Sequence, residues 1–388
     1  MRLRLYGLLA GIGFSCLGPP AAQAEETAKF GYAGGFNFES ADGRTQVKLT
    51  NRVQVLYAYN DPTAADAEGT FRIRRYKFNL EGHAFGDWKF KLQTNLASGS
   101  VLGENEQLLE DAQLQYARHA WVQPWIGQGK AFFGRQLLTS SGKLQFVDRS
   151  IATGRFAAQR QIGVGLVGHD EHRRFEYNVG IYNGEGVNKT RNRGGDYLTV
   201  ARLVYTPFGE VKLEEGAHDY PASSKLAIGV AGYSNELEPT TETELVVVFD
   251  PSTGDPTGEI DEVTVAGRPK WSVRRLGLEL AYRIRGFSLL GEYFDETREP
   301  AGASDVETDG YHLQAGYLFP NRRAEVALRR SAIDPDAVDA DLTENGIAGS
   351  WYFARHDYKV QADFHRLDSD DNPALDTDVL RVQMQFAF

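Results

Sequence analysis

Residues 45–59 read TQVKLTNRVQVLYAY, and this stretch decides the fold class. The odd-numbered positions are mostly apolar, as at Val47, Leu49 and Val53, whereas the even-numbered positions are polar up to Gln54. Alternation with a period of two is typical of a β-strand that has one apolar and one polar face. The stretch therefore predicts a strand between an apolar and an aqueous environment.

The same alternation recurs through the rest of the chain, and turn residues separate the alternating stretches. A short strand over 30–39 could precede the first of them. We expect sixteen strands, at 45–59, 71–86, 88–98, 111–123, 131–138, 161–169, 174–183, 196–206, 225–235, 271–285, 287–297, 308–319, 323–332, 344–355, 358–368 and 377–388.

The connections between these strands alternate in length. Tight turns are expected at 86–87, 285–286 and 356–357, and the links between them are longer, as at 139–160 and 236–270. Short turns at one end and long loops at the other are typical of an outer-membrane β-barrel. The link 207–224 breaks this rhythm, because it is long where a short turn is expected.

The environment of the two faces follows from the strand number. In a membrane barrel the apolar face meets lipid, and a sixteen-stranded lumen is too wide for side chains to fill. The polar face therefore indicates a water-filled lumen. The alternative is a soluble protein with several sheets. The composition excludes two other classes of protein. A content of 41% hydrophobic and 24% charged residues argues against disorder. The sequence contains no run of 18 apolar residues, so a helical membrane span is not expected.

The first 24 residues are typical of a signal peptide. Arg2 and Arg4 precede an apolar stretch, and Ala22 and Ala24 form an A-x-A cleavage site. We expect cleavage after Ala24, a short periplasmic segment over 25–44 and a barrel over 45–388 in the outer membrane of a Gram-negative bacterium. Cleavage would remove Cys16, the single cysteine, and change the net charge from −11 to −13.

Cationic side chains recur on the polar faces. In 71–83 the alternation changes phase between Arg74 and Arg75, which predicts a bulge. Cations in a lumen attract anions. Acidic side chains such as Glu279, Glu325 and Asp363 share these faces, so an ordinary polar wall is the alternative. The cations expected on lumen faces are Arg52, Arg75, Lys77, Lys89, Lys91, Arg135, Arg202, Arg275, Arg283 and Arg381.

Two long links are candidates for special roles. The link 139–160 carries Lys143, Asp148, Arg149, Arg155 and Arg160, and it would narrow the pore if it folded inward; the alternative is a surface loop. The link 236–270 is acidic and could bind calcium or the cations that bridge lipopolysaccharide, although a solvated outer loop is the simpler interpretation.

Enzyme motifs are absent from the sequence. It contains no G-x-S-x-G, no H-E-x-x-H and no P-loop. His169 and His172, near Asp170 and Glu171, form a conceivable metal cluster, but a polar turn is the simpler interpretation. We therefore expect no catalytic residues, no metal and no cofactor. The negative net charge argues against nucleic acid as a partner.

The sequence resembles the phosphate-selective porin O and P family. The resemblance rests on KLTNRVQ at 48–54, FRIRRYKF at 71–78, GDWKF at 86–90, EDA at 110–112 and FGR at 133–135. It implies a sixteen-stranded barrel, usually trimeric, with an arginine ladder and inward-folded loops that form an anion site. It further implies that Arg52, Arg74 and Arg75 are ladder arginines and that Lys143 lies in the constriction loop. That loop carries one lysine rather than a cluster, and the nearest candidates for the family's arginine-rich fifth outer loop are Arg268, Lys270, Arg274 and Arg275.

Together these features predict an outer-membrane porin that passively conducts small hydrophilic solutes, among them anions such as phosphate. Its partners would be the solute, outer-membrane lipid and lipopolysaccharide, and two further copies in a homotrimer. The alternatives are a general or cation-preferring porin, and a surface enzyme or adhesin carried on a closed barrel. The residues expected to line the pore or bind anions are Arg52, Arg74, Arg75, Lys77, Lys89, Lys91, Arg135, Lys143, Arg155, Arg202, Arg275 and Arg283.

Overall fold

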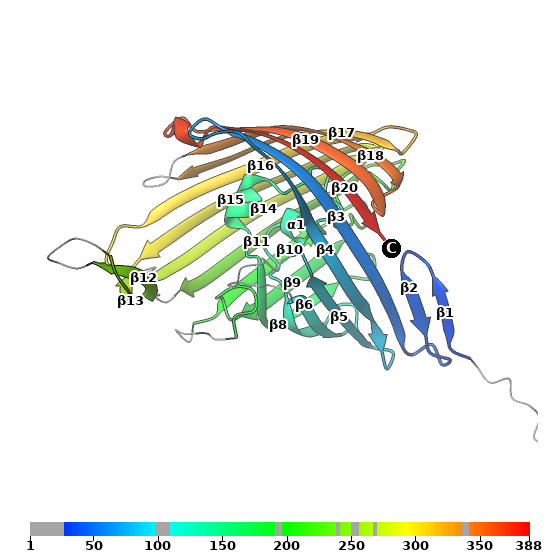
Figure 1. Ribbon diagram of the computed structural model, residues 1–388. Coiled ribbons are helices and arrows are strands. Elements are labelled where there is room, and N and C mark those ends of the chain that lie inside the picture. The colour runs from blue at the N-terminus through cyan, green and yellow to red at the C-terminus, as the bar shows by residue number, and fades with distance from the viewer. Residues whose placement is uncertain are drawn as a thin grey trace, which may run out of the picture.

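The chain forms a closed antiparallel barrel of sixteen strands, which confirms the predicted fold class (Figure 1). The last strand pairs with the first barrel strand, from Thr377 opposite Pro62 to Ala387 opposite Arg52, so the sheet has no open edge along this seam. The computed structural model describes residues 27–97, 109–190, 192, 196–237, 241–249, 256–266, 270–335 and 341–388. The predicted signal peptide lies outside the described residues.

The barrel strands differ in length around the wall. Five of the six strands from β5 to β10 have eight residues, whereas the remaining barrel strands have 11 to 17. The strands are β3 Gln46–Pro62, β4 Glu68–Ala84, β5 Trp88–Asn95, β6 Leu109–Tyr116, β7 Gln123–Lys130, β8 Arg160–His169, β9 Phe175–Tyr182, β10 Leu198–Tyr205, β11 Lys225–Leu237, β14 Trp271–Ile284, β15 Phe287–Pro300, β16 Val306–Leu318, β17 Ala324–Pro335, β18 Leu342–Ala354, β19 Tyr358–Asp368 and β20 Thr377–Ala387.

The alternation of the sequence appears directly in the barrel wall. On β20 the apolar residues Val382 and Met384 are exposed on the outside, whereas Gln383 and Gln385 are buried inside. The predicted bulge is also present, because Gln54 pairs with Arg75 and the next residue of β3 pairs with Ile73, which leaves Arg74 as the extra residue.

The prediction was wrong about the fifth barrel strand. Residues 131–138 are not a strand; the fifth strand is β7, Gln123–Lys130, and the predicted strand over 111–123 ends at Tyr116. The sequence of β7 is QPWIGQGK, and its proline and two glycines conceal the alternation. Arg135 therefore lies on a short helix and not on the lumen face of a strand.

Two hairpins are additional to the sixteen barrel strands. The segment expected to hold one short strand forms two, β1 Lys29–Tyr32 and β2 Phe36–Glu39, and β2 pairs with the start of β3. At the long-loop end, β12 Thr241–Phe249 and β13 Pro256–Ala266 form a separate two-stranded sheet within the acidic link (Figure 1). The acidic side chains of 241–262 lie outside the part of the chain whose side chains are described, so a role in cation binding stays a prediction.

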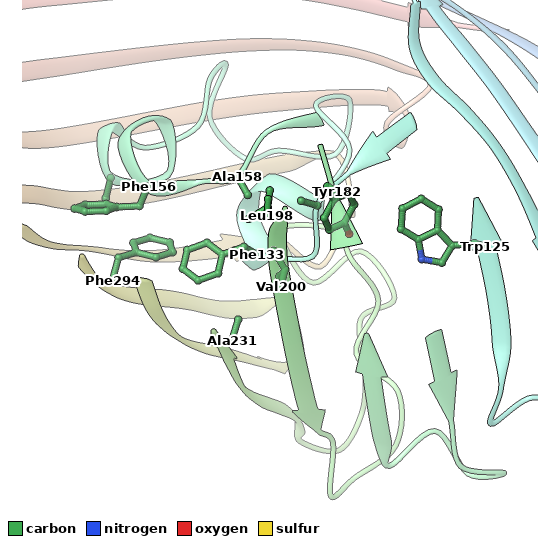
Figure 2. Close-up of a cluster of buried hydrophobic side chains, with 11 residues drawn as sticks. Trp125, Phe133, Phe156, Ala158, Tyr182, Leu198, Val200, Ala231 and Phe294 are labelled. Carbon is green, nitrogen blue, oxygen red and sulfur yellow. The ribbon is translucent and has the colours of Figure 1, made fainter. Parts of the chain in front are cut away.

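The lumen is partly filled by the segment 131–159, which folds inward between β7 and β8. It contains the helices α1 Arg135–Leu138 and α2 Ile151–Phe156. Phe133 and Phe156 of this segment pack on Phe294 of β15, with ring centroids 5.8 and 5.3 Å away, in a buried cluster that includes Val200 of β10 (Figure 2). The lumen on this side is thus a packed core and not water. A third helix, η1 Pro373–Leu375, lies in the last outer loop.

The link 206–224, which breaks the rhythm of the connections, also folds inward. Glu215 accepts hydrogen bonds from the Gln136 side chain (2.8 Å), the Gln145 backbone (2.7 Å) and the Gln314 side chain (2.9 Å). This link and 131–159 therefore support one another inside the barrel. No helix among the described residues is long and apolar enough to cross a membrane.

Candidate functional site: the passage through the barrel

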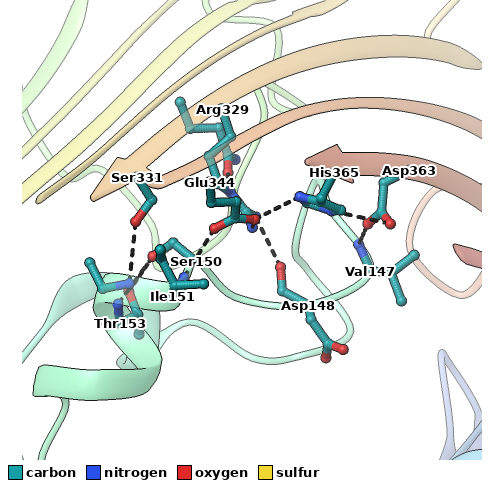
Figure 3. A network of polar contacts seen from close by, with 12 residues as sticks. Val147, Asp148, Ser150, Ile151, Thr153, Arg329, Ser331, Glu344, Asp363 and His365 are labelled. Atoms are coloured by element: carbon teal, nitrogen blue, oxygen red, sulfur yellow. Dashed lines mark hydrogen bonds and ion pairs between the residues drawn. The ribbon is translucent and has the colours of Figure 1, made fainter. Parts of the chain in front are cut away.

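The inserted segment 131–159 is fixed to one side of the wall by carboxylates of β18 and β19. The backbone N–H groups of Val147 and Ile151 donate to Asp363 (2.7 Å) and Glu344 (3.0 Å), respectively (Figure 3). Arg329 of β17 donates to the backbone carbonyl of Asp148 at 2.9 Å. Glu344 and Asp363 also pair with Arg329 (3.1 Å) and Arg381 (2.8 Å), so they present little uncompensated negative charge to a passing solute.

Open space lies on the other side, along β3 to β8. Three cavities follow one another from the short-turn end to the long-loop end, with volumes of about 480, 340 and 390 Å³. The first and second cavities share Lys91 and Gln113 in their walls, and the second and third share Glu110 and Arg160. This row of cavities, called the passage below, therefore lies eccentrically between β3–β8 and the inserted segment.

Cations outnumber carboxylates around the middle cavity. Its described lining contains six cationic and two acidic side chains. The cations are Arg75, Lys77, Lys91, Lys130, Arg149 and Arg160, and the acids are Glu110 and Asp111. The middle cavity is therefore the most cationic of the three.

Most of these cations are paired with carboxylates. Lys77 lies 2.5 Å from Glu110, and Lys91 lies 2.6 Å from Asp111. Arg160 contacts both acids, at 3.0 and 2.7 Å. On this side of the cavity, three cations therefore share two carboxylates, which leaves an excess of positive charge.

Asp148 pairs with three arginines at the edge of the cavity. Its carboxylate lies 2.7 Å from Arg74, 3.2 Å from Arg75 and 3.3 Å from Arg381. Burial alone would raise the pKa of Asp148, but these guanidinium groups lower the pKa below its usual value. Asp148 is therefore ionised at neutral pH, and it cancels one of the three positive charges.

Three further cations hydrogen-bond to neutral groups instead. Lys130 and Arg149 both donate to the Thr139 carbonyl, at 3.0 and 2.7 Å, and Arg52 donates to the hydroxyl groups of Ser140 and Ser141. Within the described part of the chain, no carboxylate lies within 4.0 Å of the charged nitrogens of these three side chains. The charges of Arg52 and Arg149 are therefore uncompensated.

Arg149 keeps its charge despite its burial. Desolvation and the neighbouring Arg75 lower the pKa of Arg149 to about 10, which leaves the guanidinium protonated at neutral pH. It shares the Thr139 carbonyl with Lys130 at the wall of the middle cavity.

The other predicted residues lie elsewhere in the lumen. Lys89 lines the cavity at the short-turn end. Arg135 and Arg202 share Glu279, at 3.4 and 2.7 Å, and Arg155 and Arg275 share Glu296. Arg283 donates to backbone carbonyls of the link 206–224, and Lys143 lies 4.0 Å from Glu214 of that link. The predicted cations therefore do not form one continuous row of unpaired charges, because most of them bind the inserted segments or neighbouring strands of the wall.

Three cations of the middle cavity were not among the predicted pore-lining residues. Lys130 was missed because β7 was not recognised. Arg149 and Arg160 were noted in the predicted loop, but nothing in the sequence indicates which cations of that loop face water. Of the candidates for an arginine-rich outer loop, Arg274 pairs with Glu299, Lys270 pairs with Glu236, and Arg268 lies outside the described residues. Among the described residues, no group of three or more His, Cys, Asp or Glu side chains is placed to hold a metal ion.

Comparison with known families decides the class of protein. The chain matches the family described as phosphate-selective porin O and P over residues 47–388. The chain belongs to this porin family. Family membership and the closed barrel point to a channel in the outer membrane of a Gram-negative bacterium rather than to an enzyme. A search of curated proteins gives no significant match.

Solved structures show the same fold at low sequence identity. The porin is similar to the anion-selective porin from Comamonas acidovorans, with a TM-score of 0.61 and 14% identity over 89% of this chain and 100% of that one. It is similar to in-vitro folded OmpT of Vibrio cholerae in its trimer form, with a TM-score of 0.60 and 10% identity over 88% and 99% of the two chains. For the channel DcaP of Acinetobacter baumannii, the TM-score is 0.58 and the identity 12% over 90% and 99%.

Proposed function

We propose that this porin conducts small hydrophilic solutes and prefers anions, and that the selectivity arises at the middle cavity. The observation that carries the proposal is the uncompensated charge of Arg52 and Arg149 beside that cavity. A ring of like charge selects ions at the narrow part of a pore, where a passing ion cannot avoid it.

The distribution of carboxylates supports the same preference. The acids of β18 and β19 pair with Arg329 and Arg381, and Glu110, Asp111 and Asp148 are each shared by at least two cations. The net charge of −11 is therefore not the charge that a solute meets at the middle cavity.

Phosphate is the solute that we propose to bind there. Guanidinium groups match phosphate oxygens through paired hydrogen bonds, and several modest contacts allow release as well as binding. The test is to add phosphate to a single channel that carries chloride current in a planar bilayer. We expect a saturable reduction of the current that an equal ionic strength of extra chloride does not produce. A phosphate effect no larger than that of chloride would remove phosphate from the proposal.

A general or cation-preferring porin is the second candidate. The observation that favours it is the negative net charge together with the acidic link 236–270 at the long-loop end. On this account, the charges of the outer loops would set the ion selectivity, and charge changes at the middle cavity would have little effect on it.

Asp148→Asn should strengthen the preference for anions. The substitution removes the carboxylate that neutralises one charge of Arg74, Arg75 and Arg381. One unit of charge at about 4 Å is worth about 1 kcal/mol in water, so the anion-to-cation permeability ratio should rise by about fivefold at low salt. The exposed Asp370→Asn, with the same change in charge, is the control. A lower or unchanged ratio for Asp148→Asn would contradict the charge assignment.

We further propose a homotrimer in which the wall from β5 to β10 contacts other copies. A transmembrane strand needs about 9–11 residues to span the bilayer, and five of these six strands have eight. The structurally similar OmpT has a trimer form. Native mass spectrometry in detergent should give three times the mass of one chain. A monomeric mass under conditions where the channel conducts would contradict this arrangement.

A further inference from the structure

The N-terminal hairpin 29–39 continues the barrel wall beyond the last strand. β20 pairs with β3 as far as Arg52, and Phe388 exchanges backbone hydrogen bonds with Asn51, at 2.7 and 3.0 Å. β2 then takes over the same edge of β3, with Phe36 opposite Leu49 and Glu39 opposite Gln46. Figure 1 shows the hairpin beside the C-terminus. The family match begins at residue 47, so the hairpin precedes the part of the chain that matches the family.

The register gives the hairpin one aromatic face. Phe36 and Phe38 pair with Leu49 and Val47 of β3, and through β1 they pair with Tyr32 and Phe30. Directly opposed residues of neighbouring strands point to the same side of a sheet, so all four aromatic side chains lie on the apolar outer face of the barrel. They remain uncovered in the monomer: 74% of Phe30 and 60% of Tyr32 is exposed.

The opposite face of the hairpin is polar and belongs to the passage. Lys29 and Glu39 form an ion pair there at 3.4 Å. Asn37 lines the cavity at the short-turn end, together with Gln46 and Lys48 of β3. The hairpin therefore separates the mouth of the passage from whatever lies outside the barrel.

Aromatic side chains already surround this end of the barrel. Rings of neighbouring strands contact one another on the outside, as in Phe353–Tyr358 (4.4 Å), Tyr358–Phe386 (5.9 Å) and Trp88–Tyr116 (5.0 Å). Such girdles lie at the level of the lipid headgroups, because aromatic rings with a polar or polarisable edge favour that region. Phe386 and Phe388 of this girdle immediately precede the hairpin along the edge of β3.

We propose that the hairpin 29–39 binds lipid, with Phe30, Tyr32, Phe36 and Phe38 in the headgroup region of the periplasmic leaflet. The aromatic face continues the girdle across the seam between β20 and β3, where the barrel would otherwise expose the edge of β3 below Asn51. The proposal requires that the barrel lies in the outer membrane, and it is independent of which solute passes.

Site-specific labelling tests the proposal. Cys16 is the single cysteine of the chain, so a Cys16→Ser background makes an introduced cysteine unique. Tyr32→Cys places a fluorophore on the aromatic face, Asn37→Cys is the matched control on the polar face, and Phe386→Cys is the reference on the barrel girdle. Each labelled porin is reconstituted into phosphatidylethanolamine–phosphatidylglycerol vesicles, and its conductance is recorded, so that a misfolded variant is recognised; Phe30→Cys replaces Tyr32→Cys if the latter does not conduct.

The readout is quenching by a nitroxide on the lipid headgroup and by iodide in water. We expect the labels at positions 32 and 386 to lose most of their fluorescence to the nitroxide, and the label at 37 to respond to iodide alone. Iodide quenching at position 32 with no response to the nitroxide would overturn the proposal, because the hairpin would then lie in water. Disulfide formation between the Tyr32→Cys sites of two copies would also overturn it, because another porin chain would then cover the aromatic face. Normal conductance with either result would leave the channel function intact.

Discussion

Replacing Lys130 and Arg149 together by glutamine will lower the anion preference. Both side chains line the middle cavity and donate to backbone carbonyls instead of carboxylates. One unit of charge contributes about 1 kcal/mol of attraction to an anion at about 4 Å in water, so the loss of the Arg149 charge alone should lower the anion-to-cation permeability ratio by about fivefold at low salt. The reversal potential in a potassium chloride gradient measures this ratio.

Glutamine is chosen because its amide N–H can still donate to the carbonyls of α1 and Thr139. The double variant is thus designed to change the charge without moving the inserted segment. A movement of that segment would change the single-channel conductance. Arg330→Gln is the matched control, because Arg330 lies exposed at the outer face of β17 and contacts Tyr311 and Asn345. An unchanged permeability ratio in the double variant, or an equal decrease in Arg330→Gln, would contradict a role of Lys130 and Arg149 in anion selectivity.

Glu215→Ala will loosen both inserted segments. Its carboxylate accepts three hydrogen bonds from Gln136, Gln145 and Gln314, and the substitution leaves these buried donors without their acceptor. A buried polar group left without its partner costs about 1–3 kcal/mol, so we expect a loss of stability and a larger, noisier conductance as the segments move apart.

Two measurements follow this change. The temperature at which the barrel unfolds, read from heat-dependent gel mobility, should fall, and single-channel conductance should rise. Glu210→Ala is the control in the same link, since Glu210 forms only an exposed ion pair with Arg173 at 3.4 Å, and such pairs contribute about 0–1 kcal/mol. Unchanged stability and conductance in Glu215→Ala would show that the link does not support the inserted segment.

The barrel could be predicted from the sequence because each strand meets two different solvents. Lipid outside and water or protein inside impose the alternation seen at Val382, Gln383 and Met384, and the change of phase at Arg74 marked the bulge correctly. β7 escaped detection because its glycines carry no side chain that could alternate. The local pattern was sufficient to predict a strand wherever its side chains alternate between apolar and polar.

The organisation of the lumen depends on contacts that no local pattern reports. Arg74 and Arg149 look alike in the sequence, yet one is neutralised by Asp148 and the other donates to carbonyls of its own segment. Glu215 was not singled out in the sequence; only the length of its link was unexpected. The pairing of Arg74 with Asp148 and the hydrogen bonds of Glu215 join residues 70 to 99 positions apart along the chain, and only the closed barrel brings them together.

The most direct test of anion selectivity is the reversal potential of the unmodified porin in a planar bilayer that separates two potassium chloride concentrations. The uncompensated charges of Arg52 and Arg149 predict a reversal potential shifted toward the equilibrium potential of chloride, and a shift that grows as salt is lowered, because screening weakens. A reversal potential displaced toward that of potassium would contradict the assignment of selectivity to the middle cavity.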